Sequence, residues 1–543
     1  MREIITLQLG QQSNYLASHF WNAQESYFTY GAEEESPIDH DVHFKPGIGS
    51  DGTETFMPRT VIYDLKGGFG TLRKINSLYE IDGDPSSSSL WSGQTVIQRQ
   101  QPIEASAYQE SLDAGQAPAE LTTNTVRYWS DFNRVFYHPK SIIQLSEYEL
   151  NSTVMPFEKW HMGEELFASL DKEHDLLDRD LRPFVEEADQ MQGLQIMTGI
   201  DDAWGGFVAK YMERLRDEYG KTPTWVFGSQ APSRGLPREK RLLKLVNKAR
   251  TLSELNSQAS LVIPLALPER PLPSTIQLDY SSSWHVSALF AAALESVTLY
   301  TRLRTSDRIY SSNLGNMTDL LNVFGKQTIA NLEMSIFEAP KPHQNGTNGT
   351  NGTSDETNGL NGRGENIGRL FENGINLDDE SESGSQKGAA TLDIDLSSPQ
   401  DLNLDTSGRR RRKRHIFSQV IGDRGLQNLE RANDDGNREL REYGMRRRPK
   451  FHNYRSRVAF PILDSYPKIF RDSYGHPVRE NVSVKTALST DSTVTDKVKA
   501  IRNTVVRSIG LEDRETIGNE LAEIADSYKE GWSSDSDDDD DDE

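Results

Sequence analysis

The 543-residue sequence contains no cysteine. Disulfide bonds, thiolate zinc sites and cysteine nucleophiles are therefore excluded, and the chain needs no oxidising compartment. It also lacks the roughly 18 consecutive apolar residues of a membrane-spanning helix. Cations are scarce relative to carboxylates. The net charge of −23 at pH 7 disfavours nucleic acid as a partner, because phosphate contacts require clustered cations. We therefore expect protein partners and no integral membrane span.

Common catalytic and nucleotide-binding motifs are missing as well. The chain holds neither H-E-x-x-H nor G-x-S-x-G, and its 11 histidines do not cluster at metal-ligand spacing. Gly47, Gly49 and Gly52 fit G-x-G-x-x-G, but no strand leads into them and no helix follows, so we interpret them as a loop. Residues 220–222 resemble the end of a Walker A loop, yet Leu215 occupies the position of its first glycine. We predict no metal site and no catalytic residue.

The apolar pattern that is present predicts alternating strands and helices, which is typical of a mostly parallel α/β sheet. The chain opens with a strand over 2–9 and a tight turn at Gly10 and Gln11. A helix follows, for which Ser13 or Asn14 is the expected cap. Further strands are predicted over 60–65, 194–198, 224–228 and 261–267. Further helices are predicted over 126–137, 207–220, 238–255, 284–300, 494–509 and 517–528, while 31–57 and 81–95 are interpreted as loops.

Residues 340–408 differ in composition from the rest of the chain. They contain an Asn-Gly-Thr repeat and a single aromatic residue, Phe371. Such a segment buries too little apolar surface to offset the entropy of ordering, so we predict a disordered insertion. The basic run Arg409–Arg414 follows. It is compatible with nuclear import or nucleic-acid contact, with an anionic membrane surface, or with a solvated linker end. The acidic tail, 531–543, either binds basic partners or keeps the chain soluble.

Two sets of segments resemble known families. The opening MREIITLQLGQQSN, HFW at 19–21, and the segments 58–65, 192–195 and 214–219 resemble tubulins in order and spacing. A second set is similar to the Misato family, known in fungi as mitochondrial-inheritance tubulin-like proteins. This set comprises 63–72, 128–141, 182–195, 201–207, 282–290 and the Asp-rich end after Trp532. The resemblance covers about 1–337 and 450–543.

The resemblance implies a tubulin-like, Rossmann-type parallel sheet flanked by helices, with a second α+β domain, C-terminal helices, a long disordered insertion and an acidic tail. The expected domain organisation has five parts. They are an N-terminal segment over 1–118, a segment completing the sheet over 119–310, a second and C-terminal helical part over 311–339 and 416–530, the insertion over 340–415, and the tail over 531–543.

The chain departs from tubulins where tubulins hold the GTP phosphates on a glycine-rich loop. The corresponding residues run from Gly199 to Gly206 and include Asp201, Asp202 and Trp204. Most glycines are gone, and two carboxylates stand where the resemblance places phosphate, so close approach and positive potential are both lost. Within this segment no Lys or Arg compensates. We expect no GTP cofactor and no GTPase activity. Gly10 and Gln11 then remain as a vestigial nucleotide turn.

The resemblance further implies a non-enzymatic role in partitioning mitochondria and inheriting mitochondrial DNA. Two alternatives stay open: a cytosolic cofactor of tubulin folding or spindle assembly, and a weak GTP-binding protein that polymerises. Expected partners are mitochondrial outer-membrane proteins or tubulin- and chaperonin-related proteins. Because residues 1–10 resemble neither a secretory signal nor a mitochondrial presequence, we expect the outer, cytosolic face of the mitochondrion, with a cytosolic pool.

Overall fold

The computed structural model describes residues 3–29, 35–48, 54–72, 103–233, 235–268, 271–304, 312–338, 390–397, 414–425, 450–472, 474–508 and 511–529. The strands are β1 Glu3–Leu9, β2 Phe44–Ile48, β3 Glu54–Pro58, β4 Thr60–Lys66, β5 Ile142–Glu149, β6 Met191–Gly199, β7 Thr224–Ser229, β8 Leu261–Leu265, β9 Asn331–Glu338, β10 Ile394–Asp395, β11 Ile416–Arg424, β12 Lys450–Ser456 and β13 Val482–Asp491. The helices are α1 Gln11–Glu25, α2 Ala107–Asp113, α3 Trp160–His174, α4 Arg182–Glu186, α5 Trp204–Glu218, α6 Arg238–Gln258, α7 Ser283–Thr298, α8 Leu314–Leu321, α11 Thr493–Val505 and α12 Leu511–Ser527.

The larger sheet is parallel throughout and has the order β5-β4-β1-β6-β7-β8. The chain therefore runs outward from β1 to β4 and β5, and then returns to add β6, β7 and β8 on the other side of β1. The two directions meet between β1 and β6, where Leu9 lies beside Thr198. In open parallel sheets such a reversal leaves a crevice at the carboxyl ends of the strands, which is where ligands normally bind. This geometry selects the candidate site.

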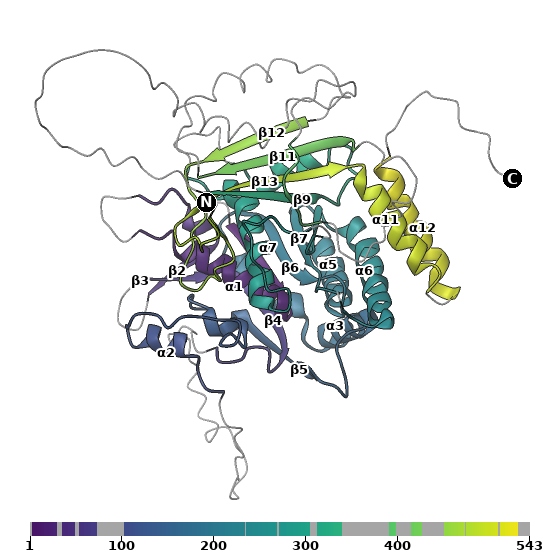
Figure 1. Cartoon of the computed structure of the whole chain (residues 1–543). Helices are drawn as coiled ribbons and strands as arrows, with labels where there is room; N and C mark the ends of the chain where they lie inside the picture. The colour runs from purple at the N-terminus through teal and green to yellow at the C-terminus, as the bar shows by residue number, and fades with distance from the viewer. Residues whose placement is uncertain are drawn as a thin grey trace, which may run out of the picture.

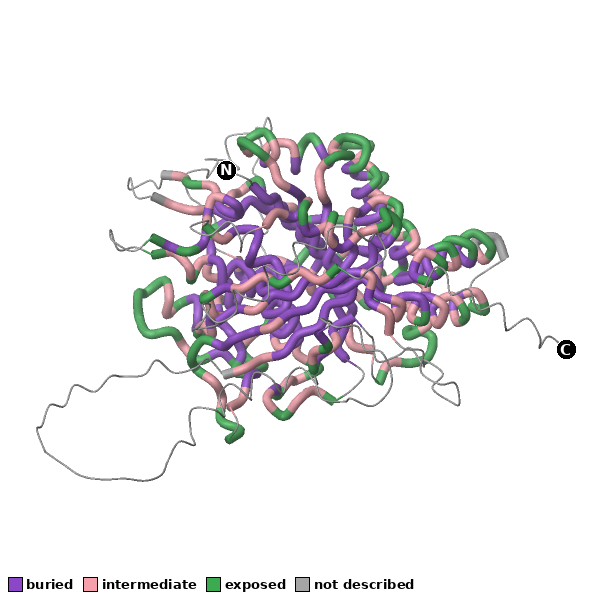
Figure 2. Tube along the Cα trace, turned by 90° about the horizontal axis from the view of Figure 1, so that it is seen from above, coloured by how far each residue is buried: buried purple, intermediate pink, exposed green. Residues whose placement is uncertain are grey.

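Helices cover both faces of this sheet (Figure 1). Ile4 and Met197 pack with α1 and α7 on one face, whereas Leu7 and Ile196 pack with α3, α5 and α6 on the other. Alternate residues of each strand are thus buried on opposite faces of the sheet. Because both faces are buried, the sequences of these strands are nearly continuous apolar runs. Figure 2 shows this buried interior surrounded by exposed loops and helix faces.

A second sheet has the order β10-β9-β13-β11-β12, with only β11 and β12 parallel. Helix α7 lies between the two sheets and is buried along most of its length, as its apolar sequence predicts. Helices α11 and α12 pack against each other and against α6. The parallel sheet, the second sheet and the C-terminal helices confirm the predicted fold class.

Buried charges link the two sheets. Glu295 of α7 receives Arg302 Nη2 at 2.6 Å and the Tyr27 hydroxyl at 3.0 Å, and it also pairs with Arg424 of β11. The side chains of Glu295, Arg302 and Arg424 are fully buried. Because removing one partner from such a group leaves a buried charge uncompensated, the arrangement fixes how α1, α7 and β11 meet.

Three local predictions are wrong. The segment 126–137 is not a helix: its aromatic residues Trp129 and Phe132 are buried, but they lie in a single 3₁₀ turn, Trp129–Phe132. Asp131 explains this, because its carboxylate accepts the backbone N–H groups of Arg127 and Tyr128. The loop predicted over 31–57 contains the β2–β3 hairpin. Helix α1 begins at Gln11 without a side-chain cap, so neither Ser13 nor Asn14 caps it.

The insertion predicted over 340–415 includes an ordered segment. Residues 390–397 are placed, and Ile394–Asp395 forms β10 against β9. Ile394 and Leu396 are buried in the main core despite their polar neighbours in sequence. Arg414, assigned to the basic run, forms ion pairs with Glu333 and Asp491. The disorder prediction is therefore wrong for 390–397 and 414–415. Residues 340–389, 398–413, 81–95 and 531–543, together with Gly49 and Gly52, lie outside the described residues.

Candidate functional site

The turn after β1 is held by the protein itself. Gly10 adopts φ 85°, a left-handed conformation that favours glycine, and its N–H donates to the Tyr63 carbonyl at 3.0 Å. The Gln11 side chain donates to the Gly68 carbonyl at 2.8 Å, and Asn14 Nδ2 donates to Asp64 Oδ2 at 2.8 Å. The polar side chains of this turn thus have partners in the loop after β4. Gly10 and Gln11 thus lie at the switch point, where their hydrogen bonds connect the end of β1 with the end of β4.

Trp204, the first residue of α5, occupies the space above this turn. A Cβ atom placed on Gly10 would lie 2.3 Å from Trp204 Nε1, so the indole packs directly on the glycine. Trp204 is 5% exposed and stacks edge-on with Phe157 and Phe207, at centroid distances of 5.4 and 5.5 Å. A ligand phosphate placed over Gly10 would have to displace a large, buried aromatic side chain. In this structure the crevice at the switch point is closed by the protein.

Gly205 and Gly206, which lie in the first turn of α5, are used for packing. A Cβ on Gly206 would lie 1.9 Å from the Trp160 carbonyl oxygen of α3, and one on Gly205 would lie 2.1 Å from Thr251 Oγ1 of α6. These positions therefore need glycine because two helices approach closely. The same glycines that would bring a backbone near a phosphate instead bring α5 near α3 and α6.

Asp202 faces inward from this loop. Its Oδ1 accepts the Trp204 N–H at 2.9 Å, which holds the start of α5. Burial, followed by the charge of the neighbouring Asp201, raises the pKa of Asp202 to about 7. A carboxyl with such a pKa retains much of its proton near neutrality. The loop therefore carries less negative charge than its sequence suggests, even though Lys244 partly offsets the effect of burial on Asp202.

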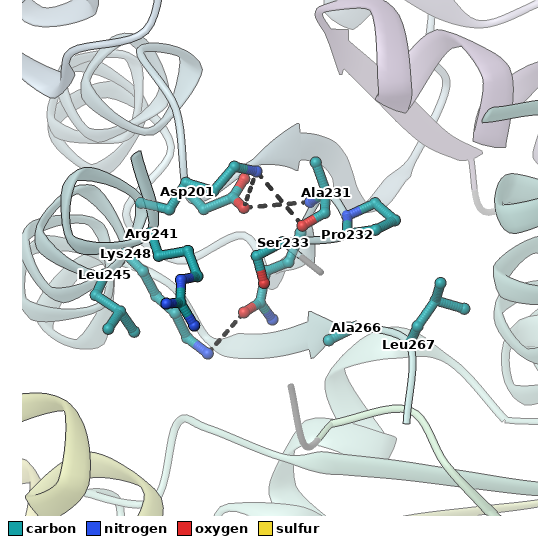
Figure 3. A pocket seen from close by; sticks show the side chains of 11 residues that line it. Asp201, Ala231, Pro232, Ser233, Arg241, Leu245, Lys248, Ala266 and Leu267 are labelled. Atoms are coloured by element: carbon teal, nitrogen blue, oxygen red, sulfur yellow. Dashed lines mark hydrogen bonds and ion pairs between the residues drawn. The ribbon is translucent and has the colours of Figure 1, made fainter. Parts of the chain in front are cut away.

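Asp201 faces the opposite way and has a cationic partner. Its Oδ2 accepts Lys244 Nζ at 2.9 Å and the Ala231 N–H at 3.2 Å (Figure 3). Lys244 comes from α6, 43 positions along the chain. The expectation that no cation compensates these carboxylates holds only within the loop, and the tertiary structure corrects it. The sequence did predict a helix over 238–255, but its spacing did not reveal which lysine would reach Asp201.

In the described part of the chain, no three His, Asp or Glu side chains converge in a way that could hold a metal ion. None of its helices combines the length and apolar character needed to cross a bilayer. The switch point and the neighbouring face of α6 are thus the regions where polar groups and strand ends come together.

Comparison with known proteins places this architecture in a family. The tubulin domain matches residues 118–303, and the Misato Segment II tubulin-like domain matches residues 2–114. The protein named dml-1 from Neurospora crassa is 53% identical over 555 residues and covers 100% of both chains. The DML1 protein of Gibberella zeae is 46% identical over 543 residues with the same coverage, and that of Yarrowia lipolytica is 28% identical over 559 residues, covering 99% of both. The chain therefore belongs to the Misato family of tubulin-like proteins.

Proposed function

We propose that this protein is a non-enzymatic, tubulin-like scaffold that acts in the partitioning of mitochondria and the inheritance of mitochondrial DNA. It works at the cytosolic face of the outer membrane and exchanges with a cytosolic pool. Membership of the Misato family supports the tubulin-like character. The mitochondrial role rests on the resemblance to the fungal mitochondrial-inheritance proteins. Its partners are proteins of the outer membrane.

One observation, the packing of Trp204 on Gly10, supports our proposal that the protein does not hydrolyse GTP. Phosphate binding at a strand-to-helix turn requires unhindered N–H groups and a positive local potential. Here the indole covers the turn, and the Trp204 N–H is already bonded to Asp202. Hydrolysis demands more, since it needs a positioned water and stabilised charge on the γ-phosphate. The sheet serves as a rigid framework, and GTP is not its cofactor.

Titration calorimetry with GTP and Mg²⁺ tests this directly. We expect no binding at micromolar protein, and no guanine nucleotide in the purified protein. Assembled tubulin run in parallel verifies that the nucleotide and buffer are competent. A dissociation constant in the micromolar range or below for the unmodified protein would contradict the proposal and favour a GTP-binding polymer.

The cellular role is tested by depletion and by protease treatment of intact mitochondria. We expect depleted cells to missegregate mitochondria and lose mitochondrial DNA, and we expect protease to digest the mitochondrial fraction of the protein. Pull-downs should recover outer-membrane proteins. Normal mitochondrial segregation combined with spindle defects and chaperonin recovery would replace this proposal with the cytosolic tubulin-cofactor role. Full protection from protease would place the protein inside the organelle.

A further inference from the structure

A second cavity lies beside the closed crevice, between α6 and the carboxyl ends of β7 and β8 (Figure 3). Gln230 separates the two regions. Its backbone carbonyl accepts Gln12 Nε2 from α1 at 3.3 Å, whereas its side chain turns toward α6 and accepts Lys248 Nζ at 2.7 Å. The cavity has a volume of about 40 Å³. That is room for about three water-sized groups, so the enclosed part of the cavity suits a phosphate group.

The described residues that line this cavity carry an excess of positive charge. Arg241, Lys244 and Lys248 follow one another at helical spacings of three and four, which places them on one face of α6. The carboxylate among these lining residues is Asp201, which is paired with Lys244. Three cations and one carboxylate leave a net charge of +2. Lys248 is 4% exposed, so part of this charge is held away from water.

The cavity also contains a buried donor without an acceptor. Gln230 is 6% exposed, and its Nε2 has no hydrogen-bond partner. The orientation of the amide follows from chemistry, because the Lys248 ammonium can only donate and therefore requires the amide oxygen. A buried amide N–H left unbonded is unfavourable, because the hydrogen bond to water that it gives up on folding is not replaced. An acceptor oxygen in the cavity would remove that cost.

We propose that this cavity is a binding site for a phosphate group, free or as a monoester. A phosphate is an acceptor for the unbonded Gln230 Nε2, and its negative charge and further oxygens suit the exposed Arg241 guanidinium beside it. Arg241 is exposed at the cavity, so the remainder of a monoester extends from there into solvent. Asp201 orients Lys244 without entering the site. The site is separate from the Gly10 turn and does not depend on the absence of GTP binding.

Arg241→Gln is the main test, because no partner in the described structure is lost with it. Titration of the full-length protein with inorganic phosphate at low ionic strength should give saturable, millimolar or tighter binding. Arg241→Gln should weaken that binding about tenfold, as expected for one charge-assisted hydrogen bond. Lys240→Gln is the matched control. It removes the same charge one residue away, but Lys240 pairs with Glu158 and does not line the cavity. The affinity of the Lys240→Gln variant for phosphate should change by less than about twofold.

Three titrants identify the source of the group. Inorganic phosphate and glycerol phosphate should both bind if a monoester is accepted, whereas phosphate alone should bind if the site takes the free ion. Acetate at the same concentrations should not compete. Equal competition by acetate, equal weakening by Arg241→Gln and Lys240→Gln, or no binding at millimolar phosphate would each overturn the assignment. Thermal unfolding of both variants without phosphate verifies that they fold.

Discussion

Asp201 and Asp202 are neighbours in sequence, yet they lie in opposite environments. Asp202 faces the closed crevice, where Trp204 packs on Gly10 and the nearest donor is a backbone N–H. Asp201 faces the α6 cavity, where Lys244 supplies a full charge. Burial, together with the negative charge of Asp201, raises the pKa of Asp202 to about 7, although Lys244 acts in the opposite direction. Asp201 is instead paired directly with Lys244.

This difference shows how one loop can be closed by packing on one side and keep charged groups around a cavity on the other. On the crevice side, an aromatic side chain fills the space and the remaining glycines serve helix packing. On the α6 side, cations and an unpaired amide remain around an open cavity. Because filled and open regions respond differently to substitution, mutations across the loop can separate them.

Removing the side chain that closes the crevice should have the largest effect. Trp204→Ala takes away a buried aromatic group that contacts Gly10, Phe157 and Phe207, so we expect the free energy of unfolding to fall by about 3–5 kcal/mol. Urea unfolding measures this. Phe136→Ala is the control, because Phe136 is 51% exposed and its truncation should cost far less. Equal effects would mean that Trp204 does not fill the crevice.

Adding a methyl group beneath the indole should have the next largest effect. Gly10 and Gly67 have nearly the same φ angle, 85° and 84°. Only at Gly10 would an added Cβ meet Trp204. Gly67→Ala should therefore cost about 1–2 kcal/mol of backbone strain. Gly10→Ala should add about 1–3 kcal/mol for overpacking.

Combining Gly10→Ala with Trp204→Ala sharpens this comparison. The methyl group then enters space that the indole has left, so the extra cost of Gly10→Ala over Gly67→Ala should disappear. Chemical unfolding of the single and double variants gives the coupling energy. Additive effects in the double variant would show that the two residues are not in contact.

Breaking the ion pair on the α6 side should have an intermediate effect. Lys244→Met leaves the Asp201 carboxylate, which is 7% exposed, without its cation, and we expect a loss of about 2 kcal/mol. Lys240→Met breaks an exposed pair with Glu158 on the same helix and should cost less than about 1 kcal/mol. Thermal or urea unfolding compares the two. A similar cost for both would indicate that Asp201 does not need Lys244.

Per unit of pH, the smallest expected change is a titration on the crevice side. Because its folded pKa of about 7 exceeds the usual value of 3.8, Asp202 binds its proton more tightly when folded. This group therefore makes the protein progressively less stable as pH rises from about 4 to 7, by at most about 1.4 kcal/mol per pH unit. Asp202→Asn keeps an acceptor for the Trp204 N–H and removes this titration.

Unfolding curves of the two proteins should therefore agree near pH 4 and separate up to pH 7. The asparagine variant should be the more stable at neutral pH, and the difference should stay constant above it. Asp64 and Glu333 also have pKa values raised to about 7 by burial, but they contribute equally to both proteins. Parallel curves across this range would show that Asp202 titrates normally in the folded state.

The sequence by itself determined the parallel sheet. Strands β1, β6, β7 and β8 are buried on both faces, so their apolar runs stand out, and the glycine at the end of β1 marks the turn. It also determined the loss of glycines between β6 and α5. These features depend on residues close together in the chain, which is why local patterns reveal them.

The tertiary structure alone decided where the charged groups of that loop would go. Lys244 lies 43 positions from Asp201, and no spacing rule links a loop to one side chain of a later helix. The same holds for β10. Its polar neighbours in sequence conceal the strand pattern of Ile394 and Leu396, which are buried only because β10 pairs with β9. The deciding contact in 126–137 is local instead, because the Asp131 carboxylate accepts the N–H groups of Arg127 and Tyr128 and so competes with helix formation. In each case the deciding contact exists only after distant or competing groups are brought together, because hydrogen bonds and ion pairs are short-ranged.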